Sequence, residues 1–238
     1  MRIKLNYIYV FLWGALVFFL MAFAQRRNSN RLLGEVNVYF TNNENLYITS
    51  DDVNNLLIQN EVAAGRVAKD SLDLSKVEAI LDHHDMIENA EVYMSIDGKM
   101  GALITQRQPV ARVLGNPSYY IDRNGKFMPL SSNHSARVPL VTGLGDDQIE
   151  EAYPLLDYIS KDEFLKKNIT AVHRNPDGTF QIRVREFDFV VSLGRVSGMD
   201  RKFSNFKAFY QKAMKDQKLD AYSHVNLRFG NQVVSTKK

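Results

Sequence analysis

Residues 90–105, AEVYMSIDGKMGALIT, contain the pattern that decides the first part of the fold. Apolar and polar side chains alternate from Ala90 to Ile96, as in a strand with one buried face. Asp97-Gly98 is a favoured two-residue hairpin turn, because both central positions of that turn take positive φ. Residues 102–105 then return as a second strand. This stretch predicts an antiparallel hairpin.

A strand and two amphipathic helices are expected before the hairpin. Residues 36–40 alternate like a half-buried strand. Thr49-Ser50-Asp51-Asp52 has the spacing of a capping box and is followed by apolar residues at helical intervals. Ser75-Lys76-Val77-Glu78 has the same spacing and predicts the start of a second helix. Together these elements predict a βααββ unit over residues 34–112.

The second half of the chain differs in composition, because all six prolines lie at or after Pro109. The shift predicts a domain boundary near Gln108–Val113, with a second, β-rich domain at 113–238. One or two helices are expected between 147 and 167, the second opened by Ser160 with Glu163. The chain is therefore predicted to be α+β, with an antiparallel sheet and packed helices. The expected strands are 119–122, 126–130, 138–142, 169–174, 179–185, 187–193 and 223–234, and a further helix is expected at 200–217.

The amino-terminal segment is strongly apolar. Residues 7–24 carry no charge over 18 positions, and as a helix they would rise roughly 27 Å, close to the thickness of a bilayer core. They predict a transmembrane helix between a head at 1–6 and a linker at 25–33. A cleavable signal peptide ending at Ala22-Phe23-Ala24 and a buried soluble helix are the alternatives. The residues that mark the span are Tyr7, Trp13, Leu20 and Ala24.

Composition excludes several kinds of chemistry. The 238 residues contain no cysteine, so neither a disulfide framework nor a thiol nucleophile is possible. A net charge of +3, with no basic run between aromatics, does not indicate nucleic-acid binding. Asp82-His83-His84-Asp85 offers four ligand types, but neighbouring helical residues point about 100° apart and cannot converge on one metal. No nucleophile elbow, zinc-protease motif or phosphate loop is present. A glycosidase-type pair of carboxylates stays an alternative that nothing in the sequence specifically supports. We expect no enzymatic activity, cofactor or metal site.

The positive signal is for protein interaction. Val225, Leu227 and Phe229 alternate with polar residues in the last expected strand. A terminal strand often lies at a sheet edge, where its free backbone groups accept another strand. An ordinary strand with a covered edge is the alternative, and Lys237 and Lys238 would protect such an edge. The preceding helix has a basic outer face formed by Lys207, Lys212, Lys215 and Lys218.

Short motifs occur along the chain in a fixed order. They are Ile48–Val53, Gln106–Arg112, Tyr119–Asp122 with Gly125, Val138–Gly143, Phe189–Gly194, Lys202-Phe203 and Val225–Phe229. This ordered series covers nearly the whole chain and resembles the FtsQ/DivIB family of bacterial cell-division proteins. The βααββ unit resembles a POTRA domain, and Ile48–Val53 resembles the entry to its first helix.

The resemblance implies a single-pass protein of the cell inner membrane. Its amino terminus would be cytoplasmic and its body periplasmic, at the division septum. It implies a scaffold without catalysis or cofactor, which joins FtsB and FtsL to septal peptidoglycan synthesis by adding a strand beside the last strand. An anchored cell-wall hydrolase and a POTRA-bearing secretion component are the alternatives. The expected partner-binding residues are Tyr222, Val225, Leu227, Arg228, Phe229, Asn231, Val233 and Val234.

Overall fold

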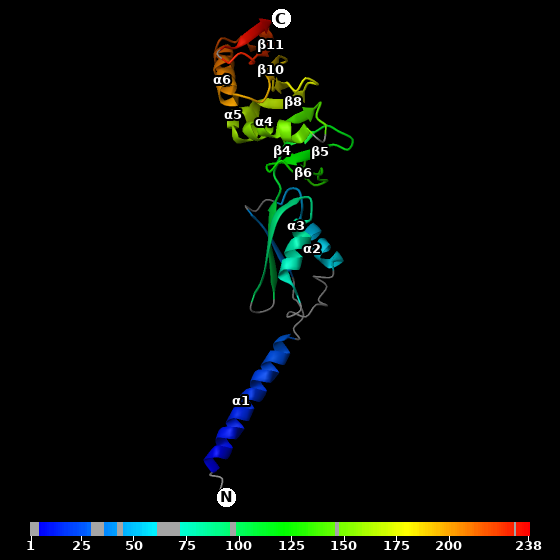
Figure 1. The fold of residues 1–238 in the computed structure, drawn as a ribbon, viewed down its shortest axis with the longest axis vertical. Helices are drawn as coiled ribbons and strands as arrows, with labels where there is room; N and C mark the ends of the chain where they lie inside the picture. Colours follow the sequence, from blue (N-terminus) through cyan, green and yellow to red (C-terminus); the bar gives the residue numbers. More distant parts are fainter. Residues whose placement is uncertain are drawn as a thin grey trace. The chain divides into compact units, whose positions relative to one another are not determined.

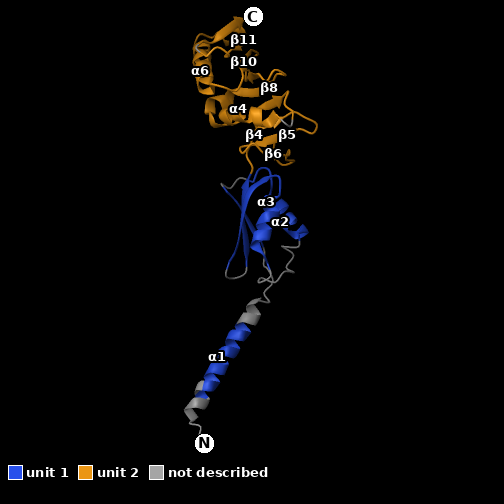
Figure 2. Cartoon of the chain, in the orientation of Figure 1, with its two compact units in different colours: residues 1–106 blue, residues 107–238 orange. Residues whose placement is uncertain are grey.

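A computed structural model describes most of the chain, and it divides into two compact units (Figure 2). The described residues are 5–29, 36–41, 45–60, 72–95, 99–145, 148–230 and 232–238. The first unit is Met1–Gln106 and the second is Arg107–Lys238.

Helix α1 spans Leu5–Ser29 and contains the segment predicted to cross a membrane. The side chains of Trp13 and Leu20 on this helix are exposed. Tyr7 belongs to the helix, but its side chain is outside the described part. Over the described residues, no helix combines the length and the apolar character that crossing a bilayer requires. The helix of the prediction is therefore present, while its transmembrane assignment is not supported.

The rest of the first unit confirms the predicted βααββ order (Figure 1). Strand β1 forms the parallel pair with β3, and β2 forms the antiparallel pair with β3, so the sheet order is β1-β3-β2. The Asp97-Gly98 turn lies outside the described residues, although the antiparallel register of its two strands agrees with a hairpin. The elements are β1 (Val36–Phe40), α2 (Ser50–Gln59), α3 (Leu74–Asp82), β2 (Ile87–Met94) and β3 (Met100–Gln106).

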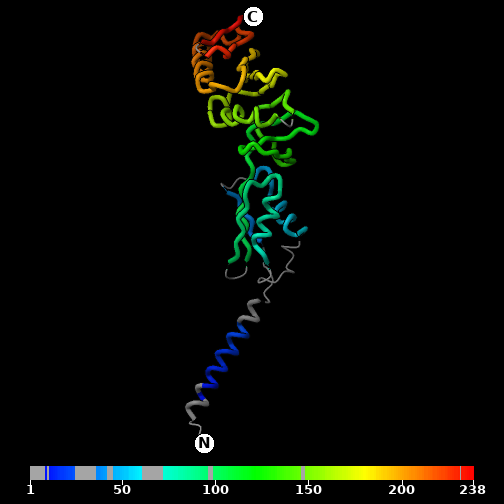
Figure 3. Tube along the Cα trace, viewed as in Figure 1, coloured from blue at the N-terminus to red at the C-terminus, as the bar shows by residue number. Residues whose placement is uncertain are grey.

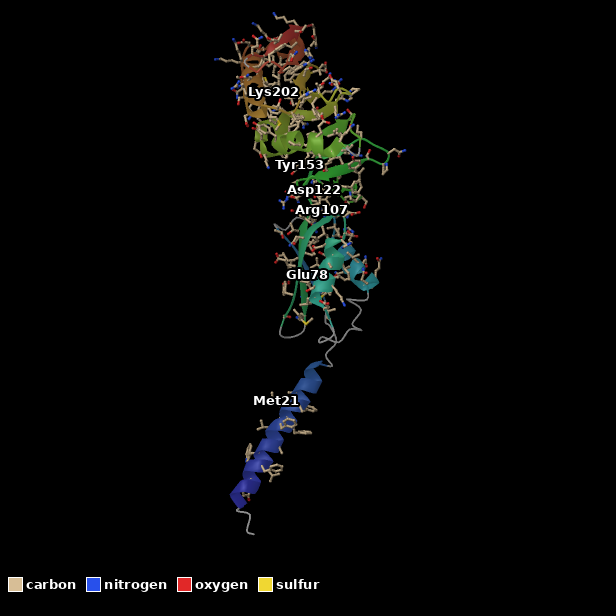
Figure 4. The ribbon with its side chains drawn as sticks, in the orientation of Figure 1. Met21, Glu78, Arg107, Asp122, Tyr153 and Lys202 are labelled. Carbon is tan, nitrogen blue, oxygen red and sulfur yellow. The ribbon has the colours of Figure 1, made fainter. Side chains whose placement is uncertain are left out.

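The two helices begin in different ways. The capping box at Thr49 and Asp52 is confirmed, with reciprocal hydrogen bonds between side chain and backbone. The box predicted from Ser75 is wrong, because α3 begins after Asp73, whose carboxylate accepts from the N–H groups of Ser75 and Lys76. Glu78, labelled in Figure 4, instead reaches β2 and accepts the Val92 N–H at 2.9 Å.

The second unit is built on one nine-stranded sheet, with the order β12-β11-β10-β9-β8-β7-β4-β5-β6. Strand β4 belongs to this sheet, whereas residues 109–112 were predicted to belong to the βααββ unit. The sheet strands are β4 (Pro109–Val113), β5 (Tyr119–Asp122), β6 (Phe127–Met128), β7 (Leu140–Thr142), β8 (Ile169–Arg174), β9 (Phe180–Val184), β10 (Val190–Gly194), β11 (Tyr222–Asn226) and β12 (Val234–Lys237). The helices are α4 (Ile149–Lys161), α5 (Glu163–Asn168), α6 (Met199–Lys215) and the short 3-10 helix η4 (Leu219–Ala221).

A continuous register separates the two faces of this sheet. One row of paired residues is buried against side chains of α4, α5 and α6, and the adjacent row faces away from that core. Because side chains alternate along each strand, this single register decides which residues are buried and which are accessible. The buried row is Val113, Val141, Val172, Ile182, Val191 and Val225, and the other row is Arg112, Leu140, Ala171, Arg183, Val190 and His224.

Two expectations for the second unit are corrected. Ser160 does not open a helix, because it lies in α4 and its hydroxyl donates to the Asp157 carbonyl. Asp162 caps α5 instead, by accepting the Leu165 N–H at 3.0 Å. The single strand expected at 223–234 is two strands, β11 and β12, which pair antiparallel (red in Figure 3).

A buried carboxylate organises the start of the second unit. Asp122 is fully buried and pairs with Arg107 at 2.7 Å, and both are labelled in Figure 4. Its other oxygen accepts the N–H groups of Asn124 and Lys126. The turn between these residues needs Gly125, whose φ is +75°. One side chain thus joins the segment before β4, strand β5 and the β5–β6 turn.

A second charge pair joins α5 to α6. Lys207 donates to the carboxylate of Asp162, the N-cap of α5. Burial by itself raises the pKa of Asp162, but the hydrogen bonds from Lys207 and from the N–H groups of Leu165 and Phe164 lower it by more. The net pKa lies below its ordinary value. This pair therefore stabilises the fold only while Asp162 is ionised.

We predict that Asp122→Asn lowers the free energy of unfolding by about 3 kcal/mol, because it leaves the Arg107 charge buried without a counter-charge. Urea unfolding measures the change. Asp188→Asn, at an exposed position, is the control and should stay within about 0.5 kcal/mol of the wild type. Equal effects of the two substitutions would contradict the role given to Asp122.

Asp162→Asn provides a pH test, because asparagine keeps the N-cap and removes the charge. The folded-state pKa of Asp162 is lowered, so its contribution is present at neutral pH and is lost as the pH falls through that lowered value. The wild type should therefore be more stable than the variant at neutral pH, and the difference should shrink in acid. Urea unfolding across that range measures it, and a difference independent of pH would refute the assignment.

Candidate functional site

The candidate site is the end of the large sheet formed by β10, β11 and β12. Strand β10 pairs with β11 in parallel, and β11 pairs with β12 antiparallel. Because β12 is the last strand in the sheet order, no other strand of the described residues lies on its outer side. Alternate residues of such a strand direct backbone N–H and C=O groups away from the sheet. The site is thus a row of backbone hydrogen-bonding groups.

Strand β12 pairs with β11 up to the end of the chain. The Lys238 N–H donates to the Ala221 carbonyl at 2.8 Å, which extends the pairing past the strand. The Ser223 hydroxyl donates to the carbonyls of Thr236 and Lys237, both at 3.3 Å. All four side chains of β12 are exposed. Strand β12 is therefore an exposed strand at the end of the described sheet.

The connection between β11 and β12 carries an exposed aromatic ring. Leu227 is buried, and its N–H donates to the Ser192 carbonyl of β10 at 2.9 Å. The Arg228 N–H donates to the Asn226 side chain at 3.0 Å, and the chain leaves the ladder there. Phe229 follows with 51% of its surface exposed. An exposed phenylalanine in the connection that leads into the edge strand is a suitable contact for a partner.

Arg228 has a defined position at the site. Gly194 has φ +76°, and a Cβ added there would lie 2.9 Å from the Arg228 side chain. Hydrogen bonds from Thr179 lower the pKa of Asp177 most, and the charge of Arg228 lowers it further. The stem of Arg228 thus lies over Gly194, with its charge acting on Asp177.

Helix α6 flanks the site through two contacts. The Asn205 side chain donates to the Gly230 carbonyl at 3.4 Å, and the rings of Phe209 and Tyr222 have centroids 5.1 Å apart. Lys207 was expected on a basic outer face, but it is partly buried and pairs with Asp162. Lys202, labelled in Figure 4, is buried and donates to the Arg195 carbonyl at 2.8 Å. Burial lowers the pKa of this lysine.

The predicted partner-binding residues fall into three groups. Arg228, Phe229 and Val234 are exposed at the site. Tyr222 and Val233 are partly buried against the core, while Asn231 is outside the described residues. Val225 and Leu227 are fully buried, so their side chains support the sheet.

The strand that forms the edge was not predicted from the sequence. The predicted last strand ends at Val234, and Lys237 and Lys238 were expected only to protect an edge, whereas β12 begins at Val234 and includes Ser235, Thr236 and Lys237. Gly230 followed by Val233 and Val234 was the available signal for a turn and a second strand.

The arrangement nearest to a nucleophile and base is Ser192 beside His224, with Oγ and Nε2 2.7 Å apart. Ser192 is only 4% exposed, so a substrate could not reach its hydroxyl. His173 bonds the Thr142 hydroxyl at 2.8 Å in a neighbouring part of the sheet. Both histidines thus take part in hydrogen bonds between strands.

The Asp82–Asp85 cluster likewise has structural contacts. Asp82 accepts the Ala90 N–H at 2.7 Å, and the His84 ring nitrogen accepts the Met86 N–H at 3.2 Å. Within the ranges given above, no group of three or more possible ligands could hold a metal ion.

Comparison with known proteins matches this architecture to one family. The family model described as FtsQ/DivIB, C-terminal related, matches residues 108–236, which include the whole candidate site. A curated relative from Salinibacter ruber, named cell division protein FtsQ, is 26% identical over 59% of this chain. A protein of the same name from Rhodothermus marinus is 26% identical over 68% of this chain. The matches span 60% and 65% of these relatives, less than two thirds of either. Because the family model covers more than half of the chain, the protein belongs to the FtsQ/DivIB family.

Proposed function

We propose that this protein is a non-enzymatic scaffold of bacterial cell division, and that it binds a partner by adding a β-strand to β12. The observation that carries the proposal is the edge of β12, which has exposed side chains and, in the part of the chain that the structure describes, no strand on its outer side. Backbone groups on such an edge supply affinity, and adjacent pockets or side chains supply specificity. Membership of the family supports the cell-division role.

The partner proposed for this edge is FtsB, acting together with FtsL, and the complex would link this chain to septal peptidoglycan synthesis. The exposed side chains of Phe229, Arg228 and Val234 would contact the added strand. Buried Val225 and Leu227 would act indirectly, by holding β11 in place. This division of roles follows from burial and separates contact residues from support residues.

The first unit is proposed to be a POTRA domain, followed by a β domain of the FtsQ type. Its βααββ order and its three-stranded sheet support that assignment. Attachment to the inner membrane through residues 7–24 and a periplasmic body at the septum stay predictions of the sequence and the family. Cell fractionation and protease accessibility of tagged chains test both.

A proline scan of Ser235 and Thr236 tests strand addition. Neighbouring N–H groups of an edge strand point in opposite directions, so one proline breaks the ladder to β11 and the other removes an outward donor. We expect one variant to lower the melting temperature. The other should keep the wild-type melting temperature and lose co-purification with FtsB. Full FtsB binding by both variants would overturn the proposal.

Phe229→Asp tests the aromatic contact. Loss of a central aromatic at an interface costs about 2 kcal/mol, which is roughly a thirtyfold weaker affinity for FtsB. Phe127→Asp is the matched control, because Phe127 is also 51% exposed but lies in β6, at the opposite end of the same sheet. Titration of each purified variant with FtsB measures the affinity. Equal losses would exclude a specific role for Phe229.

A further inference from the structure

The second unit has another surface that takes no part in the proposed strand addition. A groove of about 1010 Å³ lies between α5, the segment that enters β7, the start of β8 and the residue after β9. We call it the α5 groove. Four of its lining residues are basic, namely Arg137, Lys166, Lys167 and Arg185. All four are exposed.

The α5 groove combines this charge with an apolar floor. Leu140 is 39% exposed, and the partly buried Phe164 also lines the groove. Glu163 is the one acidic residue among the lining residues, so their formal balance is three positive charges. The apolar area at Leu140 and Phe164 contacts water in the free protein. Its burial by a ligand that also neutralises the four cations would be favourable.

Local contacts hold the basic wall in place. The Arg185 guanidinium donates through Nε to the Lys167 carbonyl at 2.9 Å, and the Arg185 N–H donates to the Asn168 carbonyl at 2.7 Å. These bonds join the end of β9 to the end of α5. The neighbouring carboxylate of Asp162 is paired with Lys207, so its charge is already compensated. The positive charge of the groove is therefore not neutralised from that side.

We propose that the α5 groove binds an acidic segment of a partner protein, with an apolar side chain placed on the floor at Leu140 and Phe164. Charge complementarity selects the acidic groups, and the apolar floor selects a peptide over a phosphate polymer or an acidic glycan, which would leave that floor uncovered. Strand β8 lies four places from β12 in the sheet order, roughly 19 Å away at the usual strand spacing. The groove is a separate site from the β12 edge.

Selection of short random peptides displayed on phage, by the purified full chain, tests this proposal. We expect enriched peptides to combine several acidic residues with at least one large apolar residue. A labelled copy of one enriched peptide is then titrated in solution. Its affinity should fall with rising salt, because exposed charge pairs are screened. Enrichment without an acidic bias would overturn the proposal.

Charge variants locate the bound peptide. The double variant Lys166→Glu with Lys167→Glu should weaken the peptide roughly tenfold, since two attractive contacts become repulsive. Lys212→Glu with Lys215→Glu is the matched control, because it makes the same change in the last turn of α6. The control should bind like the wild type. A loss confined to the α6 variant would place the peptide elsewhere and refute the groove.

A second pair of variants tests the floor. Leu140→Ser should weaken the peptide roughly fivefold through lost apolar burial. Leu130→Ser is the control, since Leu130 has a similar exposure of 37% and does not line the groove. Displacement of the peptide by inorganic polyphosphate, together with no effect of Leu140→Ser, would show a simple anion surface and contradict the proposal. Unchanged melting temperatures and FtsB co-purification confirm that all variants are folded and separate this result from strand addition.

Discussion

The fold and the proposed function depend on how the backbone groups at the sheet edges find hydrogen-bond partners. A backbone N–H at a sheet edge needs an acceptor or remains available to another strand. In the first unit, Glu78 and Asp82 of α3 accept the N–H groups of Val92 and Ala90, and so they cover the edge of β2. In the second unit, β12 has no comparable side-chain cover on its outer side among the contacts described above. Function is proposed where an edge is left open.

Much of this fold could be predicted from local patterns in the sequence. Local signals were sufficient for the βααββ unit, because the Thr49 capping box and the alternation before Asp97 act over a few residues. The turn around Asn175 and Gly178 also has a local cause, since Gly178 has φ +76°. Most of the strands and the long helix α6 follow from such patterns. Their boundaries differ by only a few residues.

The remaining features depend on contacts across the fold. Apolar alternation through Val225, Leu227 and Phe229 continues past the true end of β11, so pattern alone predicts one long strand. The Leu227 N–H still bonds to Ser192 of β10, and the chain leaves the ladder at Arg228, whose N–H bonds to the Asn226 side chain. Strand β12 then pairs where only the assembled sheet offers a neighbour. The α5 groove was missed for the same reason, since its walls come from four separate segments.

The parallel pairing of β10 with β11 also affects the rate at which the sheet forms. The two strands are separated by α6, so the chain must close a long loop before the pair forms, and contacts of that kind form slowly. Among the described strands, the exposed strand β12 pairs with β11 alone, and such an end strand belongs to the part of a sheet that opens at the lowest free energy. A bound strand would supply the missing second neighbour. Binding of a partner strand would therefore slow hydrogen exchange in β12, the strand that is otherwise protected least.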